Sequence, residues 1–316
     1  MIHSKGKLLI TGEYLVLDGA TALALPTKPG QSLQCDTYPP ETGADLFGST
    51  VSVPKAPLLE WKSYDHQKQL WFEATFDLNY FSPQEYSNFK TAHQVSRLLQ
   101  SCRALNPAFL QGNHPVSIST YLDFPNDWGL GSSSTLTANM AKLSKTDAMI
   151  LHFGCFNGSG YDVAVAETGK PLLYTLFEGK PIVEPVVFNP SFRSYLWFIH
   201  LGAKQNSSRE VSDYKKRRHI AAGDIYRISD LSNHILKCQD LREFEDMLKE
   251  HEGIIAKVLD RPNIKTERFY DYPHTIKSLG AWGGDFILAT GRQEDMRYFS
   301  DKGLETIISF DELIAL

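Results

Sequence analysis

The chain has 316 residues, 42% hydrophobic and 12% aromatic, which is enough apolar material for one large or two ordinary domains and excludes a disordered protein. Its 32 lysines and arginines stand against 37 aspartates and glutamates, a net charge of −5, so no overall basic field would attract nucleic acid. An anionic substrate would therefore need local cations.

The cysteines and the apolar runs indicate the compartment. The four cysteines are widely scattered with no C-x-x-C pair, which indicates reduced thiols and neither a disulfide framework nor a zinc site. Charged residues interrupt the first 19 positions, so no signal-peptide core is expected there, and no uncharged run approaches a membrane span. We expect a cytoplasmic protein, monomeric or homodimeric, that binds neither nucleic acid nor membrane.

The first half of the chain is predicted to be rich in strands. Short strands are expected at 7–10, 14–17, 20–25 and 116–122, with a hairpin turn at 18–19, further strand-like spacing from 27 to about 78, and a helix at 89–105. Helices are expected next at 135–143 and 146–153, the second with Thr146 as its N-cap.

The second half of the chain is predicted to begin with strands and then to become mostly helical. Strands are expected at 172–177, 182–188, 195–201 and 286–290, and helices at about 210–238 and 241–259. The change near Asn189 and Pro190 favours a domain boundary there, which gives domains at 1–189 and 190–316. The basic run at 215–218 is interpreted as a solvated helix face.

A glycine- and serine-rich segment at 128–135, Trp-Gly-Leu-Gly-Ser-Ser-Ser-Thr, is the most informative feature. Glycine permits close backbone approach and positive φ, and the first turn of a helix presents unpaired N–H groups to an anion. The segment therefore predicts a phosphate cradle, although a turn that caps an ordinary helix has the same composition. The chain has no G-x-x-x-x-G-K-[ST] match, so the common P-loop is excluded.

Two charged residues lie in motifs that suit phosphoryl transfer. Lys7 begins an apolar run, and Asp162 follows the turn Gly158-Ser159-Gly160. Such a reaction needs a cation beside the transferred group and a carboxylate that orients or deprotonates the attacking hydroxyl. We expect the two side chains to be adjacent and to lower each other's pKa. Alternatively, Lys7 is a solvated strand residue and Asp162 closes an Asx-turn.

The order and spelling of four segments resemble the GHMP kinases, the superfamily of galactokinase, homoserine kinase, mevalonate kinase and phosphomevalonate kinase. The segments are GKLLITGEYLVL at 6–17, GLGSSS at 129–134, GSGYD at 158–162 and GAWGG at 280–284, and the first is most similar to the mevalonate and phosphomevalonate branch. The resemblance implies an α+β fold of two domains, a ribosomal S5 domain 2-like N-terminal domain that binds ATP and a ferredoxin-like C-terminal domain.

The resemblance also implies a set of site residues. Lys7 and Asp162 would be catalytic. ATP would be bound by Gly129, Leu130, Gly131, Ser132, Ser133 and Ser134, with Ser133 as the magnesium-side hydroxyl. The acceptor would be bound by Glu13, Tyr14, Ser208, Gly283 and Gly284, of which Ser208 lies in a polar segment at 204–209 that could also be an ordinary N-cap. ATP and Mg²⁺ are the implied cofactors.

The sequence departs from the family pattern at two places. Family members often carry a glutamate, a second magnesium ligand, about ten residues before the catalytic aspartate, and here no carboxylate lies between Asp147 and Asp162. The last motif has Trp282 and Asp285 where the family has small residues, which leaves the size and charge of the acceptor open.

The leading hypothesis is an ATP-dependent small-molecule kinase that phosphorylates a hydroxyl or a phosphate, with mevalonate as the first acceptor and phosphomevalonate as the second. Two alternatives stay open. One is a catalytically altered relative that binds a nucleotide or metabolite as a sensor or scaffold, and the other is diphosphomevalonate decarboxylase chemistry.

Overall fold

A computed structural model describes residues 1–38, 42–44, 50–52, 58–112, 114–202, 207–216, 221–280 and 284–316. The chain divides into two compact units that are interleaved in sequence. Unit 1 comprises Met1–Ser4, Gly30–Asn126 and Ser132–Phe156, and unit 2 comprises Lys5–Pro29, Asp127–Gly131 and Asn157–Leu316. The predicted boundary near position 190 is a different division, and it stays a prediction.

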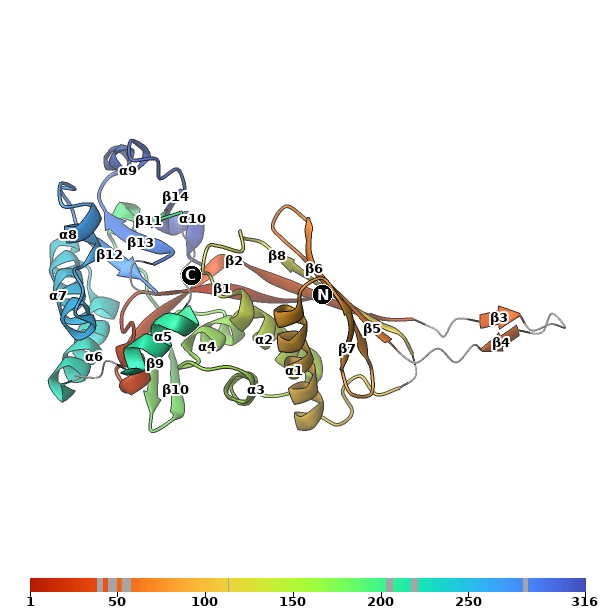
Figure 1. The fold of residues 1–316 in the computed structure, drawn as a ribbon. Helices are drawn as coiled ribbons and strands as arrows, with labels where there is room; N and C mark the ends of the chain where they lie inside the picture. Colours follow the sequence, from red (N-terminus) through yellow and green to blue (C-terminus); the bar gives the residue numbers. More distant parts are fainter. Residues whose placement is uncertain are drawn as a thin grey trace. The chain divides into compact units, whose positions relative to one another are not determined.

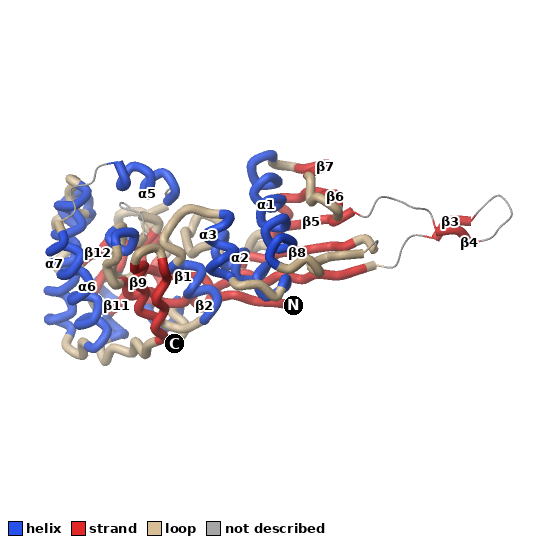
Figure 2. The backbone as a smooth tube through the Cα atoms, turned by 90° about the horizontal axis from the view of Figure 1, so that it is seen from below, coloured by secondary structure: helices blue, strands red, loops and turns tan. Residues whose placement is uncertain are grey.

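Unit 1 combines a sheet with three helices that pack against one another (Figure 2). The strand order is β2-β8-β5-β6-β7, in which only β5 and β8 are parallel. The strands are β2 (Ala22–Thr37, in unit 1 from Gly30 on), β5 (Leu58–Tyr64), β6 (Leu70–Asp77), β7 (Pro83–Tyr86) and β8 (Val116–Leu122), with a separate pair of β3 (Thr42–Ala44) and β4 (Thr50–Ser52). The helices are α1 (Phe89–Leu105), α2 (Ser132–Ser144) and α3 (Ala148–Cys155).

Unit 2 contains two groups of strands. The first half of β2 pairs with β9, and β9 pairs with β10. The second group is an antiparallel sheet in the order β12-β13-β11-β14. The strands are β1 (Ile2–Leu9, in unit 2 from Lys5 on, paired with β2), β9 (Leu172–Phe177), β10 (Lys180–Pro185), β11 (Leu196–His200), β12 (Ile276–Leu279), β13 (Phe286–Thr290) and β14 (Ile307–Ser309).

The helices of unit 2 follow the same chain order. They are α4 (Tyr161–Thr168), α5 (Ser207–Lys216), α6 (Ala222–Lys237), α7 (Leu241–Leu259), α8 (Ile264–Arg268), α9 (Arg297–Ser300) and α10 (Phe310–Leu313), with 3-10 turns η1 (Leu15–Asp18), η2 (Arg193–Tyr195) and η3 (Gln293–Met296). Figure 1 shows α6 and α7 side by side, and α7 and α8 contact β12.

Local sequence signals explain the best-formed helices. In α7 the side chains of Phe244, Leu248 and Ile255 are buried at helical spacing, which places one apolar face against the unit. The carboxylate of Asp240 accepts hydrogen bonds from the first N–H groups of α7, as an N-cap residue does. The predictions for 89–105 and 241–259 are confirmed to the residue by α1 and α7.

Two local predictions are wrong. Residues 14–17 were expected as a strand, but Tyr14 has a positive φ of 62° and η1 follows it directly. Helix α3 is capped by Asp147 rather than Thr146, because the Asp147 carboxylate accepts from the N–H of Ile150 at 2.8 Å. The helical region expected at about 210–238 contains α5 and α6.

Two expectations from composition are tested directly. All four cysteines are free thiols, as their scattered spacing predicted. Within the described ranges, no helix is both long and apolar enough to cross a membrane.

Candidate active site

The N-terminal strand β1 lies against the glycine-rich loop that precedes α2. The backbone N–H of Lys7 donates to the carbonyl oxygen of Leu130 at 2.9 Å, and the Lys7 ammonium donates to the carbonyl oxygen of Gly129 at 2.9 Å. Gly6 makes this approach possible, since a Cβ at that position would lie only 3.0 Å from the Leu130 carbonyl oxygen. The structure thus joins two of the motifs that the sequence singled out.

Helix α4 delivers the predicted carboxylate to the same ammonium. Gly160 has a φ of 83°, and the helix begins at Tyr161 with Asp162 in its first turn. The Lys7 Nζ lies 5.7 Å from the centroid of the Tyr161 ring, and it is within electrostatic range of Asp162. The Lys7 ammonium thus lies beside the first turn of α4, which carries Asp162, and the adjacency of the two side chains stays a prediction.

The charge state of Lys7 differs from the sequence-based expectation. Burial by itself would lower the pKa of Lys7, but Tyr161, Asp162 and Asp285 outweigh it, and the net pKa is raised. The expectation that the pair lowers both pKa values was wrong for Lys7, because a neighbouring carboxylate stabilises the charged ammonium. Lys7 is consequently a permanent cation at neutral pH.

The loop at 127–131 turns sharply just before α2. Gly129 and Gly131 have φ values of 64° and 91°, and α2 begins immediately afterwards at Ser132. Trp128 fixes the loop by packing edge-on against Phe286, with ring centroids 5.6 Å apart. In the first turn of α2 the Ser133 side chain is exposed, so its hydroxyl is accessible to a ligand. The positive φ angles and the helix N-terminus suit an anion.

Asp285 lies against this loop. It precedes β13, is 9% exposed, and its carboxylate occupies the space above the Cα of Gly129, where any Cβ would overlap it. Its backbone carbonyl accepts from the N–H of Leu201 at 2.9 Å, which ties it to the end of β11. The loop therefore needs glycine at 129 for two reasons, the positive φ and the neighbouring carboxylate.

A Gly129→Ala variant tests this packing. We expect a loss of about 1–2 kcal/mol in the free energy of unfolding from the positive φ alone, plus a further loss from displacing Asp285. Gly179→Ala is the matched control, because Gly179 has a φ of 75° and no atom within 4 Å of its added Cβ. Urea unfolding compares the two, and equal losses would show that Asp285 moves aside freely.

Sequence comparison gives no relative, because no protein-family profile and no curated protein matches the chain. Solved structures do match over its whole length. The Methanococcus jannaschii mevalonate kinase has a TM-score of 0.65 at 12% identity, with 100% of this chain and 98% of that one covered. The Streptococcus pneumoniae phosphomevalonate kinase, in complex with phosphomevalonate and AMPPNP, has a TM-score of 0.65 at 15% identity, with 98% and 99% covered.

A third match is the L. major mevalonate kinase in complex with R-mevalonate, with a TM-score of 0.63 at 15% identity and coverage of 97% and 94%. This chain has the GHMP kinase fold. The predicted fold class, a two-domain α+β GHMP kinase architecture, is confirmed.

Behind the first motif of this GHMP kinase fold lies a cluster of buried ionisable side chains that the sequence analysis missed. The ammonium of Lys277, on β12, is 2.5 Å from Glu13 Oε1 and 3.6 Å from Glu252 Oε1. The Gly12 N–H donates to Nε2 of His251 at 2.9 Å. The side chains of Lys277 and His251 are fully buried, and those of the two glutamates are 3–4% exposed. The turn at 12–13 is thus anchored to β12 and α7.

Burial decides the protonation of this cluster. It raises the pKa of Glu13, and it raises the pKa of Glu252 to about 7, although Lys277 opposes both shifts. Burial, and then the positive charge of Lys277, holds the pKa of His251 well below its ordinary value, so the imidazole stays neutral. Glu13 was predicted to bind the acceptor; its contacts here are with Lys277 and His251, and the substrate role stays a prediction.

The raised pKa of Glu252 predicts a pH-dependent stability. Between the ordinary value of 4.5 and about 7 the folded chain holds a proton that the unfolded chain has lost, so the free energy of unfolding falls as pH rises through this window. The loss is on the order of 3 kcal/mol, since one pKa unit corresponds to about 1.4 kcal/mol. Glu252→Gln should reduce this slope, and Glu243→Gln, exposed on the same helix, should keep it. Urea unfolding from pH 4 to 8 measures it, and identical slopes in all three proteins would contradict the assignment.

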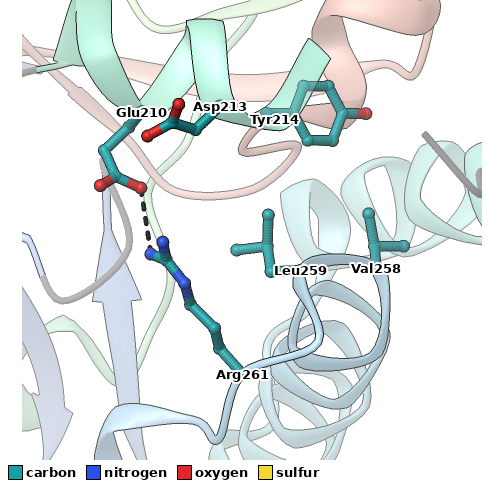
Figure 3. Close-up of a pocket in the computed structure, with 6 residues that line it drawn as sticks. All are labelled: Glu210, Asp213, Tyr214, Val258, Leu259 and Arg261. Carbon is teal, nitrogen blue, oxygen red and sulfur yellow. Dashed lines mark hydrogen bonds and ion pairs between the residues drawn. The ribbon is translucent and has the colours of Figure 1, made fainter. Parts of the chain in front are cut away.

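Tyr14 connects the first motif to a small pocket formed by α5 and the end of α7 (Figure 3). Its hydroxyl is 3.5 Å from Glu210 Oε2, and the Arg261 guanidinium is 3.1 Å from the same oxygen. The Tyr14 ring packs against Tyr214 with centroids 5.2 Å apart. The pocket is lined by Glu210, Asp213, Tyr214, Val258, Leu259 and Arg261. Tyr14 itself is 7% exposed and supports the wall of this pocket.

The remaining predicted site residues are less fully described. Ser208 lies in the first turn of α5, and its side chain is outside the described part, as is all of Gly283. Gly284 is buried just before β13. Among the described residues no group of three or more His, Cys, Asp or Glu side chains could hold a metal ion.

Proposed function

We propose that the protein is an ATP-dependent small-molecule kinase that transfers the γ-phosphoryl group of ATP to a hydroxyl or phosphate of a small acceptor. The observation that carries this proposal is the position of the Lys7 ammonium, hydrogen-bonded to the loop at Gly129 and facing Tyr161 and Asp162. The kinase neighbours support it, one of which was solved with AMPPNP.

In the proposed mechanism each part has one task. The loop at Gly129 to Gly131, together with Ser132 to Ser134 at the start of α2, binds the phosphates of ATP through backbone N–H groups and hydroxyls. Asp162 orients the acceptor hydroxyl and takes its proton, and Lys7 stabilises the negative charge that develops on the transferred group. Magnesium, when bound, would neutralise phosphate charge, and Ser133 is the residue of this chain proposed to hold it.

Mevalonate is the first acceptor that we propose, followed by phosphomevalonate. The structures with this fold include kinases solved with each of these compounds, so the fold does not choose between them. Glu13, Tyr14, Ser208, Gly283 and Gly284 remain the proposed acceptor-binding residues, and Tyr14 contacts Glu210 and Tyr214, two residues that line the pocket at α5.

A coupled ADP-release screen tests the proposal. Mevalonate, phosphomevalonate, homoserine and galactose are each offered with ATP and magnesium, with the Asp162→Asn variant as the blank for contaminating kinases. Acceptor-dependent ADP release by the wild-type protein alone is the expected result. No release with any acceptor, together with tight nucleotide binding, would instead favour a sensor or scaffold.

The sensor alternative has one specific observation in its favour, the absence of any carboxylate between Asp147 and Asp162, where the family often places a magnesium ligand. The decarboxylase alternative is separated in the same assay, because it would release carbon dioxide as ATP is consumed.

A further inference from the structure

The turn that follows the first strand is strained, and Tyr14 is its central residue. Tyr14 has φ and ψ angles of 62° and −51°, and the N–H of Leu15 donates to the carbonyl oxygen of Glu13 at 2.7 Å. These angles and this hydrogen bond define a γ-turn of the rare class with a positive φ. A bulky residue stays in such a conformation only where its surroundings hold it there. The neighbours of this turn must therefore supply the support.

Two fully buried side chains hold the residues at the start of the γ-turn. The Lys277 ammonium, on β12, donates to Glu13 Oε1 at 2.5 Å, and Nε2 of His251, on α7, accepts from the N–H of Gly12 at 2.9 Å. Gly12 also packs closely against β2, since a Cβ at that position would lie 2.6 Å from the Cβ of Ala22. All of these residues belong to unit 2. The turn is thus fixed from β12, from α7 and from β2.

The γ-turn directs the Tyr14 side chain toward α5. The Tyr14 ring packs against that of Tyr214 with centroids 5.2 Å apart, and the Tyr14 hydroxyl is 3.5 Å from Glu210 Oε2. Both partners line the pocket formed by α5 and the end of α7 (Figure 3). The backbone angles of a residue set the direction in which its side chain leaves the chain. The contacts of Tyr14 with α5 therefore depend on the γ-turn.

We propose that Lys277 is a positioning residue for the acceptor. Through its ion pair with Glu13 it maintains the γ-turn, and the γ-turn keeps Tyr14 beside the pocket at α5. This inference rests on the proposed kinase function, in which Glu13 and Tyr14 bind the acceptor, and it adds a residue that acts only through them. The proposed ATP-binding residues lie in another segment, at 129–134. Loss of this support should therefore weaken acceptor binding and leave ATP binding unchanged.

The test compares two variants of the support with a matched control. Lys277→Met removes the ion pair, and His251→Leu removes the acceptor of the Gly12 N–H without changing a charge, since the imidazole is neutral. Phe299→Ala is the control for general destabilisation, because it opens a cavity in the apolar cluster around Phe269 in the same unit. If Lys277→Met does not fold, His251→Leu decides the question alone.

Two kinds of measurement are made on the wild-type protein and the three variants. Hydrogen exchange at the Leu15 N–H, followed by mass spectrometry without denaturant, reports the opening of the γ-turn and needs no activity. The KM for the acceptor and the KM for ATP are measured with the acceptor found in the screen, at a temperature at which all the proteins compared are folded.

In Lys277→Met and His251→Leu we expect the Leu15 N–H to exchange about 10-fold faster than in Phe299→Ala, the effect of about one lost hydrogen bond. The KM for the acceptor should rise about 10-fold in both, while the KM for ATP stays within about twofold of the wild-type value. Phe299→Ala should keep both wild-type KM values.

Exchange in the two variants that is no faster than in Phe299→Ala overturns the proposal. An acceptor KM that stays at the wild-type value overturns it too, and so does an equal rise in both KM values. If the exchange difference appears but the wild-type protein phosphorylates no acceptor, the kinase function is refuted instead, so the two failures are distinguishable.

Discussion

Replacing Asp162 with asparagine is expected to lower turnover by about 10²- to 10⁴-fold, the usual contribution of a positioned general base. Asparagine has the same shape but cannot accept the acceptor's proton. Its amide oxygen can still accept the hydrogen bond that Asp162 Oδ1 receives from the N–H of Val163 at 3.0 Å, so α4 should form normally. Nucleotide affinity, measured by calorimetry, is expected to change little.

Two further variants make this result interpretable. Lys7→Met should lower turnover by about 10²- to 10³-fold, because it removes the charge that stabilises the transition state. Asp240→Asn is the control, because it makes the same chemical change at a residue that has no proposed role in catalysis. Asp240 is the N-cap of α7, and asparagine caps a helix as well as aspartate does. Normal phosphorylation by both Asp162→Asn and Lys7→Met would refute the assignment of roles.

Replacing Lys277 with methionine is expected to cost about 3–5 kcal/mol in the free energy of unfolding, the range measured when one partner of a buried ion pair is removed. Among the described residues the fully buried ammonium is the only cation within 4 Å of Glu13 and Glu252, because the imidazole of His251 beside Glu13 is neutral. Methionine fills a similar volume, so the loss reports the charge rather than a cavity. Urea unfolding at pH 7 measures it.

The controls for Lys277→Met use the same chemistry elsewhere. Lys180→Met, exposed on β10, should change stability by less than about 0.5 kcal/mol. Adding Glu13→Gln and Glu252→Gln to Lys277→Met should recover most of the loss, because no buried carboxyl group is then left without its partner. A Lys277→Met protein as stable as the wild type would show that the cluster carries no net stabilisation.

Periodic and capped segments could be predicted from the sequence because their signals are local. The strands expected at 116–122, 172–177 and 286–290 are β8, β9 and β13 to the residue. Alternation or a short apolar run bounded by turn residues was enough in each case. The segment at 14–17 failed because a run of four apolar residues fits a strand and a buried turn equally well, and only the positive φ of Tyr14 decides between them.

The residues of the candidate site likewise fall into two groups, those with a local sequence signal and those without one. Lys7, Asp162 and the loop at Gly129 could be named because their motifs are distinctive in spelling and order. Lys277 could not, since it is one lysine in the short strand Ile276–Leu279 and its only sequence signal is a charge among apolar neighbours. Tyr161 was overlooked although it is adjacent to Asp162, because nothing local shows that its ring faces Lys7.

The sequence alone determined the kinds of elements, their approximate limits and the residue types from which a phosphoryl-transfer site could be built, since these depend on neighbours within a few positions. Only the tertiary structure decided which side chains meet. Lys7 reaches a carbonyl 122 positions away, and Glu13 pairs with a lysine 264 positions away. The physical reason is that a buried charge must find its partner through space, and local periodicity carries no information about which distant strand supplies it.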